Sequence, residues 1–366
     1  MASLIGKVVR SYTERGFAAT NQQIIRRLRT SRVAARPADR VEPLESPDQT
    51  RHGVEAAAPI ADAVSPQLAL RRHLGLISNP TYAELRNQER AEVIERLAGC
   101  SPNDASPEEM EGYLQEAALR FRETLEWSET ALARVPVGVI PRILEVGSNP
   151  YFLTILLLER FSGLDHLGIN YFGDNAQLGK TYEQRIIDPT EAIASTSFLY
   201  ADVEQTWLEQ VEPVDVCLFC EVIEHLPFDP GWAMFNLASR LKPGGTVILT
   251  TPNPARWENV ERLALHTGTK DDPISAYGLH GRHNREYTAD ELADLMTGTG
   301  LSVRRQRTLD VFPNEWSESA EARGYGAYHV IEGVLDSGPS LYRPSWLYRS
   351  FAPGVLEATG PLPSAF

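Results

Sequence analysis

The fold is decided by the stretch Arg142-Ile143-Leu144-Glu145-Val146-Gly147-Ser148-Asn149-Pro150-Tyr151. Its apolar run, 143–146, is typical of a central parallel strand, and Gly147 permits a tight turn where a side chain would collide with a ligand. The apolar residues 152–158 then predict a helix. In an open α/β sheet, ligands bind beyond the carboxyl ends of the strands, near such a turn. Glu145 suits a ligand with hydroxyls or an ammonium group, whereas a phosphate would be repelled.

The composition is that of a globular protein. The 366 residues, 42% of them hydrophobic and 23% charged, allow one large domain and an accessory one. No apolar run approaches the ~20 residues of a membrane span, and the N-terminus lacks an apolar signal core. Three cysteines make no disulfide framework, so we expect a cytoplasmic protein. Cys217 and Cys220 lie three apart on a predicted strand and therefore on opposite faces, which favours buried thiols over a shared metal.

Charge is distributed unevenly along the chain. Residues 1–40 hold nine basic and two acidic side chains, a net charge of +7. Because the whole chain has a net charge of −14, the remaining residues carry −21. Such an acidic body argues against a nucleic-acid partner. We interpret 1–34 as a basic amphipathic arm, whose residues 1–30 either contact an anionic membrane surface or a partner, or pack on the acidic body. Residues 35–66, rich in Pro and Ala, are predicted to be a linker.

Two helices are expected in an accessory region at 67–134. Ser78-Asn79-Pro80 predicts a helix start that continues to about Leu97, and Ser106-Pro107 predicts a second start, with an apolar face suited to core packing. An α/β domain follows at 135–336, and 337–366 is predicted to be an irregular tail. The expected strands are 142–147, 166–170, 196–202, 214–222 and 245–251, with helices at 151–162, 174–186, 204–210 and 230–241.

The later part of the chain completes the sheet. Lys242-Pro243-Gly244-Gly245 predicts a break before the fifth strand. Further helices are expected at 255–266 and, capped by Thr288, at 289–297. Residues 301–311 and 328–335 predict an antiparallel edge pair. The whole pattern indicates an α/β, doubly wound, Rossmann-like, mostly parallel seven-stranded sheet with an N-terminal helical extension.

Three further motifs follow in order, at 220–227, 241–253 and 281–288. Together with the first stretch they resemble class I S-adenosylmethionine (SAM)-dependent methyltransferases over about residues 140–311. The fourth motif is most similar to bacterial methyltransferases of surface-glycan pathways. Of the three glycines usual in the first motif, the chain has only Gly147, because Asn149 and Tyr151 occupy the other two places.

The resemblance implies cofactor-binding roles for eight residues. The turn Gly147-Ser148-Asn149 would meet the methionine part of SAM, and Glu145 would lie near its amino group. Asn170 stands where an acid usually holds the ribose, and Asp202 where an acid usually contacts the adenine. Cys220 and Glu221 would lie under the cofactor. Asp202 can equally cap a helix before Glu204.

A second set of residues could carry the chemistry of the acceptor. Glu221, Glu224, His225 and His283 resemble the metal ligands of ubiquinone-pathway O-methyltransferases and small-RNA 2′-O-methyltransferases, where an ion holds neighbouring hydroxyls. Carboxylates with imidazoles suit a divalent cation, Mg, Mn or Zn. In relatives without metal the acids cap a helix, and Glu224, His225 or His283 would then supply a catalytic base.

The loop that carries the fourth motif also holds cationic side chains. Its residues His280, Arg282 and Arg285, with Tyr277 and Tyr287 near, can clamp an anionic substrate or pair with the acidic body.

These features predict an O-methyltransferase acting on a sugar or glycolipid hydroxyl. Three alternatives stay open. The first two are methylation of a quinone-like phenol or other small metabolite without metal, and a methyltransferase-like binding protein without activity. The third is RNA methylation, which the metal-like set favours and the acidic body opposes.

Overall fold

The computed structural model describes residues 65–105, 107–205, 208–266 and 282–336. The predicted basic arm at 1–34, almost all of the predicted linker, the tail at 337–366 and the capping residue Ser106 lie outside this range, as do Tyr277 and His280.

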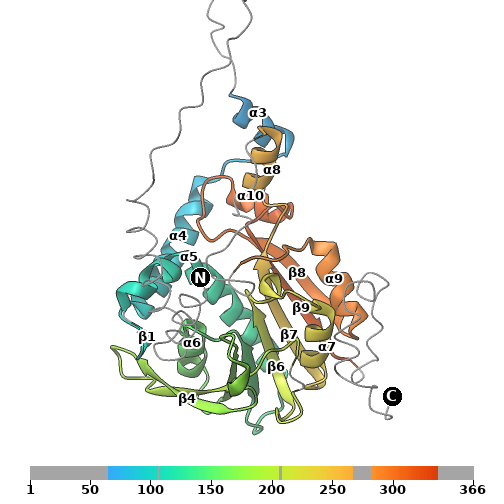
Figure 1. Cartoon of the computed structure of the whole chain (residues 1–366). Coiled ribbons are helices and arrows are strands. Elements are labelled where there is room, and N and C mark those ends of the chain that lie inside the picture. Colours follow the sequence, from blue (N-terminus) through green and yellow to red (C-terminus); the bar gives the residue numbers. More distant parts are fainter. Residues whose placement is uncertain (1–64, 106, 206–207, 267–281, 337–366) are drawn as a thin grey trace, which may run out of the picture.

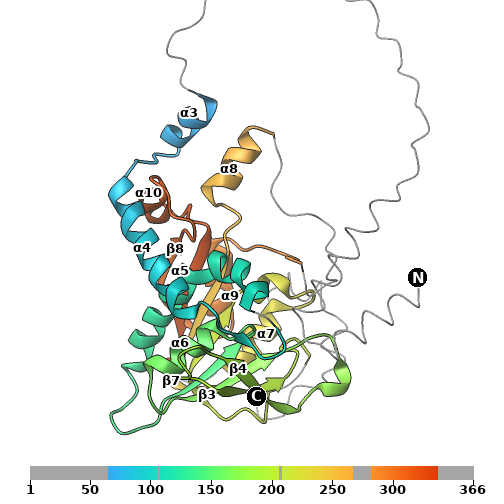
Figure 2. The same cartoon turned by 90° about the vertical axis from the view of Figure 1, so that its left-hand side faces the viewer.

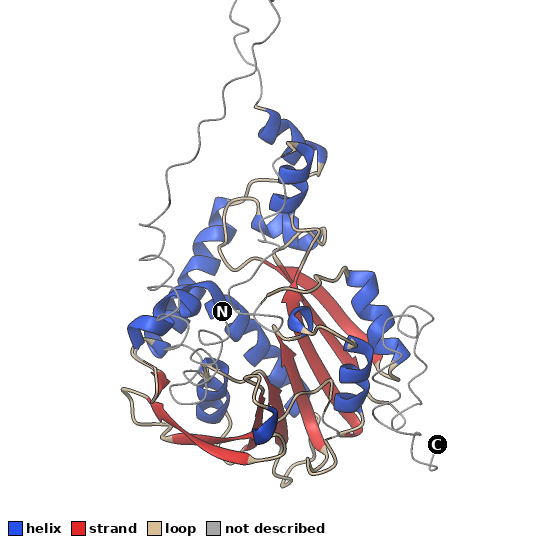
Figure 3. Ribbon diagram, in the orientation of Figure 1, coloured by secondary structure: helices blue, strands red, loops and turns tan. Residues whose placement is uncertain are grey.

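The centre of the fold is a mixed nine-stranded sheet in the order β1-β4-β5-β3-β2-β6-β7-β9-β8 (Figure 3). The five strands β5, β3, β2, β6 and β7 are mutually parallel, and the outer pairs are antiparallel. The strands are β1 (Ser101–Pro102), β2 (Arg142–Val146), β3 (Asp165–Asn170), β4 (Thr181–Ile187), β5 (Ser195–Tyr200), β6 (Val214–Cys220), β7 (Leu241–Pro252), β8 (Ser302–Leu309) and β9 (Tyr328–Val334). The doubly wound, mostly parallel arrangement is confirmed, but the expected number of seven strands was wrong.

Of the two additional strands, β4 arises where a helix was predicted, and the short β1 lies between the two helices predicted in the accessory region. Residues 174–186 form a short 3-10 turn, η2 (Asn175–Gln177), and then strand β4, instead of a helix. In β4 every second side chain is turned inward, and the Tyr182 ring stacks on Phe198 of β5 with centroids 5.4 Å apart. This cross-strand packing outweighs local helix propensity. The helix predicted at 204–210 is also absent from the described residues of that range, which form turns.

Helices cover both faces of the sheet (Figures 1 and 2). On one face α4, α5 and α6 pack against strand residues such as Ile143 and Leu218. On the other face α7 and α9 pack against Leu144 and Phe219. The helices are α3 (Pro66–His73), α4 (Pro80–Leu97), α5 (Pro107–Leu132), α6 (Phe152–Arg160), α7 (Pro230–Ala238), α8 (Trp257–Ala264), α9 (Ala289–Gly298) and α10 (Ser317–Ala322).

Several local predictions are confirmed. Asn79 caps α4 by accepting a hydrogen bond from the Tyr82 N–H at 3.2 Å. Thr288 forms a capping box with Glu291 at the start of α9. Cys217 and Cys220 are buried in the two different cores, one on each face of the sheet. The predicted break at 242–245 lies inside β7, as a bulge between the residues paired with Val214 and Val216.

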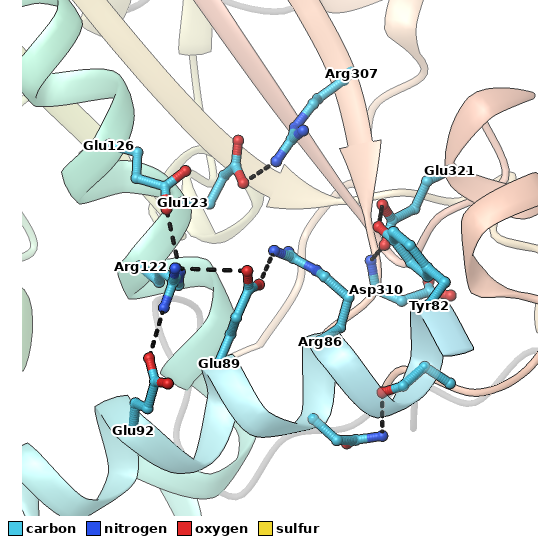
Figure 4. A network of polar contacts seen from close by, with 12 residues as sticks. Tyr82, Arg86, Glu89, Glu92, Arg122, Glu123, Glu126, Arg307, Asp310 and Glu321 are labelled. Carbon is cyan, nitrogen blue, oxygen red and sulfur yellow. Dashed lines mark hydrogen bonds and ion pairs between the residues drawn. The ribbon is translucent and has the colours of Figure 1, made fainter. Parts of the chain in front are cut away.

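A network of polar contacts fastens α4 and α5 to the far edge of the sheet (Figure 4). Tyr82 of α4 donates to Glu321 of α10 at 2.6 Å, and Arg307 of β8 pairs with Glu123 of α5. Arg122 of α5 pairs with acidic residues of its own helix and of α4. These contacts link α5 to α4 and to β8.

No helix within the described ranges is both long and apolar enough to cross a membrane.

The order of the parallel strands places a crevice between β2 and β6. From β2 the chain proceeds outward through β3 to β5 on one side, and then returns to β6 and β7 on the other. A ligand is expected beyond the carboxyl ends of the strands at such a reversal. The residues that follow β2 and β6 are therefore the first to consider.

Candidate functional site

The turn after β2 lies directly beside the end of β6. Gly147 has a left-handed φ of 73°, and its N–H donates to the Ile169 carbonyl at 2.8 Å. A Cβ at this position would lie 2.5 Å from Cγ2 of Val222, so glycine is required for both conformation and space. Tyr151, also left-handed at φ 70°, then leads into α6.

Asn170, at the end of β3, braces this turn. Its Oδ1 accepts from the Asn149 N–H at 3.1 Å, and its Nδ2 donates to Ser148 Oγ at 2.9 Å and to the Tyr151 hydroxyl at 3.2 Å. The side chain is buried. The amide therefore holds together the turn that replaces the usual glycines. A ribose contact by Asn170 stays a prediction.

Glu145 is engaged within the protein. Its Oε2 accepts a 2.6 Å hydrogen bond from Thr154 of α6 and lies 2.8 Å from Nε2 of His166 in β3. The carboxylate is buried and ties α6 to two strands. The structure thus shows a bracing contact, and the predicted contact with the cofactor amino group is untested.

Asp202 follows β5 and caps the next turn. Its Oδ1 accepts from the Glu204 N–H at 2.9 Å and its Oδ2 from the Gln205 amide at 2.6 Å. The sequence suggested a helix cap here, but Asp202 caps a turn, because the described residues after it form no helix. An adenine contact stays a prediction. Cys220 ends β6, where burial raises the pKa of its thiol to about 12.

Glu221 follows β6 in a strained conformation, with a left-handed φ of 54°. Its N–H donates to the Thr250 carbonyl at 2.9 Å, and its Oε1 accepts from Thr250 Oγ1 at 2.9 Å. Nε of Arg120, a residue of α5, lies 3.8 Å from the same oxygen. Burial raises the pKa of Glu221, and Arg120 opposes that shift.

Three donors gather beside this point. Glu224, His225 and His283 each offer one ligand atom within 4.8 Å of the others. Glu224 is buried, and its Oε2 accepts from Thr251 Oγ1 at 3.0 Å, whereas its Oε1 has no hydrogen-bond partner. Burial, and next the Glu221 charge, raise the pKa of Glu224 to about 8. The three residues come from η3 (Ile223–His225) and the loop before α9.

The two imidazoles are oriented by neighbouring groups. Nδ1 of His225 lies 3.0 Å from the Arg282 carbonyl, which can only accept, so Nδ1 carries the proton. Nδ1 of His283 lies 3.4 Å from Glu286, a carboxylate that also binds Arg256. The loop is fastened to η3, because the Asn284 N–H donates to the Glu224 carbonyl at 2.6 Å. The two rings lie 5.0 Å apart between centroids.

A family model described as a methyltransferase domain matches residues 82–306. The chain belongs to this methyltransferase family and is a SAM-dependent methyltransferase. No curated protein sequence matches it.

The methyltransferase is similar to several solved methyltransferases at low sequence identity. Magnesium protoporphyrin IX methyltransferase from Synechocystis PCC 6803 is 14% identical, with 61% of this chain and 86% of that chain covered and a TM-score of 0.40. The 1,6-didemethyltoxoflavin-N1-methyltransferase from Burkholderia thailandensis is 15% identical, with 77% of this chain and 97% of that chain covered and a TM-score of 0.38. A SAM-dependent methyltransferase from Thermotoga maritima gives 18%, 67%, 99% and 0.37.

One predicted ligand of the methyltransferase lies apart from the cluster of three donors. Among the described residues, Glu221 does not belong to the group of mutually close ligand atoms. Its carboxylate is drawn toward Thr250 and Arg120 instead. Glu224, His225 and His283 remain a set of one carboxylate and two imidazoles, with the unpartnered Oε1 of Glu224 among their atoms. Such a set suits a divalent transition-metal ion.

The predicted anion clamp is occupied by contacts within the enzyme. Arg285 pairs with Glu291 of α9 and lies 5.0 Å over the Tyr287 ring. Arg282 donates to Asn284 at 2.9 Å. The Arg285–Glu291 pair agrees with the alternative of pairing with the acidic body, whereas the Arg282 contact is to a neutral amide.

Arg120 was not predicted from the sequence to be a site residue. It lies in a helix whose apolar periodicity indicated core packing, and its position beside Glu221 depends on how α5 crosses the sheet. A basic residue in the middle of this helix, close to Tyr113 and Phe121, was the available signal.

Proposed function

We propose that this methyltransferase transfers the methyl group of SAM to a hydroxyl of a sugar or glycolipid. The observation that carries the proposal is the buried Glu224 carboxylate beside His225 and His283. Methyl transfer from a sulfonium is an in-line displacement, in which the enzyme mainly aligns the nucleophile. A hydroxyl must also lose its proton, so hydroxyl acceptors require a base or a cation.

The cluster can accept that proton. Glu224 has a pKa of about 8, near the working range of a general base. His225, from η3, and His283, from the loop before α9, lie close to Glu224. The backbone hydrogen bond from Asn284 to Glu224 joins that loop to η3. We assign Glu224, His225 and His283 as the groups that hold and remove the acceptor proton.

The same three side chains would hold a divalent cation, Mg, Mn or Zn. A bound cation would lower the pKa of neighbouring hydroxyls and fix their orientation. Sugars present such neighbouring hydroxyls, and the motif at 281–288, which resembles that of glycan-pathway enzymes, supplies His283. For a glycolipid acceptor, the basic arm at 1–34 would add attraction to an anionic membrane surface.

The test is acceptor profiling with methyl-labelled SAM. We expect label in the methyl ether of a sugar or glycolipid, and loss of that product in Glu224→Gln while S-adenosylhomocysteine (SAH) still binds. Label found only in phenols would contradict the proposal and favour the small-metabolite alternative. A folded protein that binds SAH but labels no acceptor class would favour the binding-protein alternative.

The cation is tested separately on metal-stripped enzyme titrated with Mg²⁺, Mn²⁺ or Zn²⁺ alone. One of these ions should bind to the native chain and to His266→Ala, an exposed histidine outside the cluster. Binding should weaken by at least tenfold in His283→Ala. Equal binding by both variants would remove the cation from the proposal and leave the base.

A further inference from the structure

We propose that Arg120 and Glu221 together bind the amino-acid end of SAM, with the guanidinium on its α-carboxylate and the Glu221 carboxylate on its α-ammonium. The inference rests on the cofactor dependence established above. It assigns a binding role to a residue of α5, outside the four motifs found in the sequence.

The position of Arg120 supports this inference. Arg120 lies 3.8 Å from Glu221, which directly follows β6. Seven residues before Arg120 on the same helix, the Tyr113 ring stacks on Phe152 at 6.4 Å, and Phe152 is the first residue of α6. Arg120 is thereby anchored between the end of β6 and the helix that follows the Gly147 turn. That is the crevice where the strand order reverses.

The buried charge of Arg120 also supports the inference. Its guanidinium is buried among aromatic rings, 5.2 Å from the Phe121 centroid, 5.9 Å from Tyr328 and 6.0 Å from Tyr113. Burial lowers the pKa of Arg120, but the Glu221 charge, together with Tyr113 and Tyr328, more than offsets this effect. A buried cation needs a close counter-charge with hydrogen bonds. Within the described ranges the one carboxylate that approaches within 4.0 Å is Glu221, at 3.8 Å.

The separation of the Arg120–Glu221 ion pair also supports the inference. At 3.8 Å the Arg120 and Glu221 charges attract each other without a direct hydrogen bond, and the hydrogen bond shown for the guanidinium is from Nη2 to the Tyr113 hydroxyl at 3.1 Å. The hydrogen bond from Thr250 and the ion pair with Arg120 both use Oε1 of Glu221. An amino-acid end group carries an ammonium and a carboxylate on one carbon. It can therefore supply each of these side chains with the opposite charge it lacks at hydrogen-bond distance.

The carboxylate of Glu145, the other candidate for the cofactor amino group, already has partners within the protein. Glu145, which the family resemblance assigns to the cofactor amino group, already accepts from Thr154 and contacts His166. Glu221 is instead held in a strained left-handed conformation, which is typical of functional positions. The strained residue presents its carboxylate beside Arg120.

The experiment compares three ligands by calorimetry: SAH, its decarboxylated analogue S-adenosyl-3-thiopropylamine, and 5′-methylthioadenosine, which lacks the whole amino-acid end. The native enzyme should prefer SAH to the decarboxylated analogue by 10- to 100-fold. Arg120→Met should abolish this preference, lowering SAH affinity to that of the analogue and changing the affinity for 5′-methylthioadenosine by less than threefold. Glu221→Gln should weaken both ammonium-bearing ligands and spare 5′-methylthioadenosine.

Arg122→Met is the matched control, because it makes the same substitution two residues away on the opposite, solvent side of α5. Figure 4 shows Arg122 directed toward Glu89, Glu92 and Glu126, away from the sheet. This variant should bind all three ligands as the native enzyme does.

The outcomes separate this inference from the cofactor assignment. If Arg120→Met weakens all three ligands equally, Arg120 has a purely structural role and the inference is overturned. A native enzyme that binds SAH no better than 5′-methylthioadenosine would also overturn it, while leaving cofactor binding intact. Absence of binding for every adenosyl ligand, in folded protein, would overturn both.

Discussion

Nε2 of His225 and Oε1 of Glu224 lie 3.9 Å apart, beyond hydrogen-bond distance, at a point where Oε1 has no partner among the described residues. An unpartnered buried carboxylate oxygen costs free energy. The site therefore keeps an unfavourable group next to an imidazole whose other nitrogen is fixed by the Arg282 carbonyl. This is the arrangement expected where a proton or a cation is to be received.

Glu224 should make stability fall as pH rises. Its pKa is raised from 4.5 to about 8, so the folded state holds the proton more tightly than the unfolded state. The free energy of unfolding should thus be fully supported below about pH 4.5 and decline as pH rises through about 8. Glu224→Gln should remove this decline and be more stable at pH 9 by up to ~5 kcal/mol, at ~1.4 kcal/mol per pKa unit. Urea unfolding between pH 5 and 9 measures it.

The exposed Glu95→Gln is the control for this experiment, and it should leave the pH dependence unchanged. Methyl transfer should meanwhile increase through about pH 8, as Glu224 becomes able to accept a proton. A flat pH profile for both stability and rate would contradict the role given to Glu224.

Gly147→Ala should abolish most SAH binding. The new Cβ would lie 2.5 Å from Val222 Cγ2 in a left-handed turn that is also strained for alanine. Gly163→Ala separates the two causes, because Gly163 has a φ of 80° but no atom within 4 Å of an added Cβ. We expect at least tenfold weaker SAH binding for Gly147→Ala and an unchanged affinity for Gly163→Ala. Similar affinities in calorimetry would show that the turn tolerates a side chain.

Asn170→Ala should destabilise the protein by about 2–3 kcal/mol, because it leaves buried groups of the Gly147–Tyr151 turn without hydrogen bonds. Asn170→Ser should recover only part of this loss, since one hydroxyl replaces an acceptor and two donors. Thermal unfolding measures the stability and SAH titration the pocket. Full stability of Asn170→Ala would mean that the turn does not depend on this brace.

Cys217 and Cys220 should resist thiol reagents in the folded state. Burial raises the pKa of both thiols, for Cys220 to about 12, so the reactive thiolate is scarce at neutral pH. Both are expected to react only in urea, as followed by absorbance after addition of an aromatic disulfide. Rapid labelling under native conditions would indicate that the sheet opens at β6.

Local sequence patterns predicted the elements that local chemistry controls. The start of α4 at Asn79, the capping box of α9 and the strand with its glycine turn at 142–147 were all predictable, because each depends on neighbours within a few residues. The helix predicted at 174–186 failed for the converse reason. Its residues gain more from pairing with β5, through Tyr182 and Phe198, than from local helix formation.

The candidate site shows the same division. Glu224 and His225 are neighbours in the chain, so their proximity could be expected. That His283 joins them and Glu221 does not was decided by the loop fastened to η3 and by Thr250 and Arg120, which lie far away in sequence.

The sequence by itself determined that this chain is an α/β protein with a glycine turn after its first parallel strand, because strand periodicity and glycine conformation are local properties. Only the tertiary structure decided that Asn170 braces the turn that the missing glycines would have formed, and that Arg120 of α5 comes to lie beside Glu221. These contacts join residues 22 and about 100 positions apart. They depend on strand order and on how a helix crosses the sheet, which no local pattern encodes.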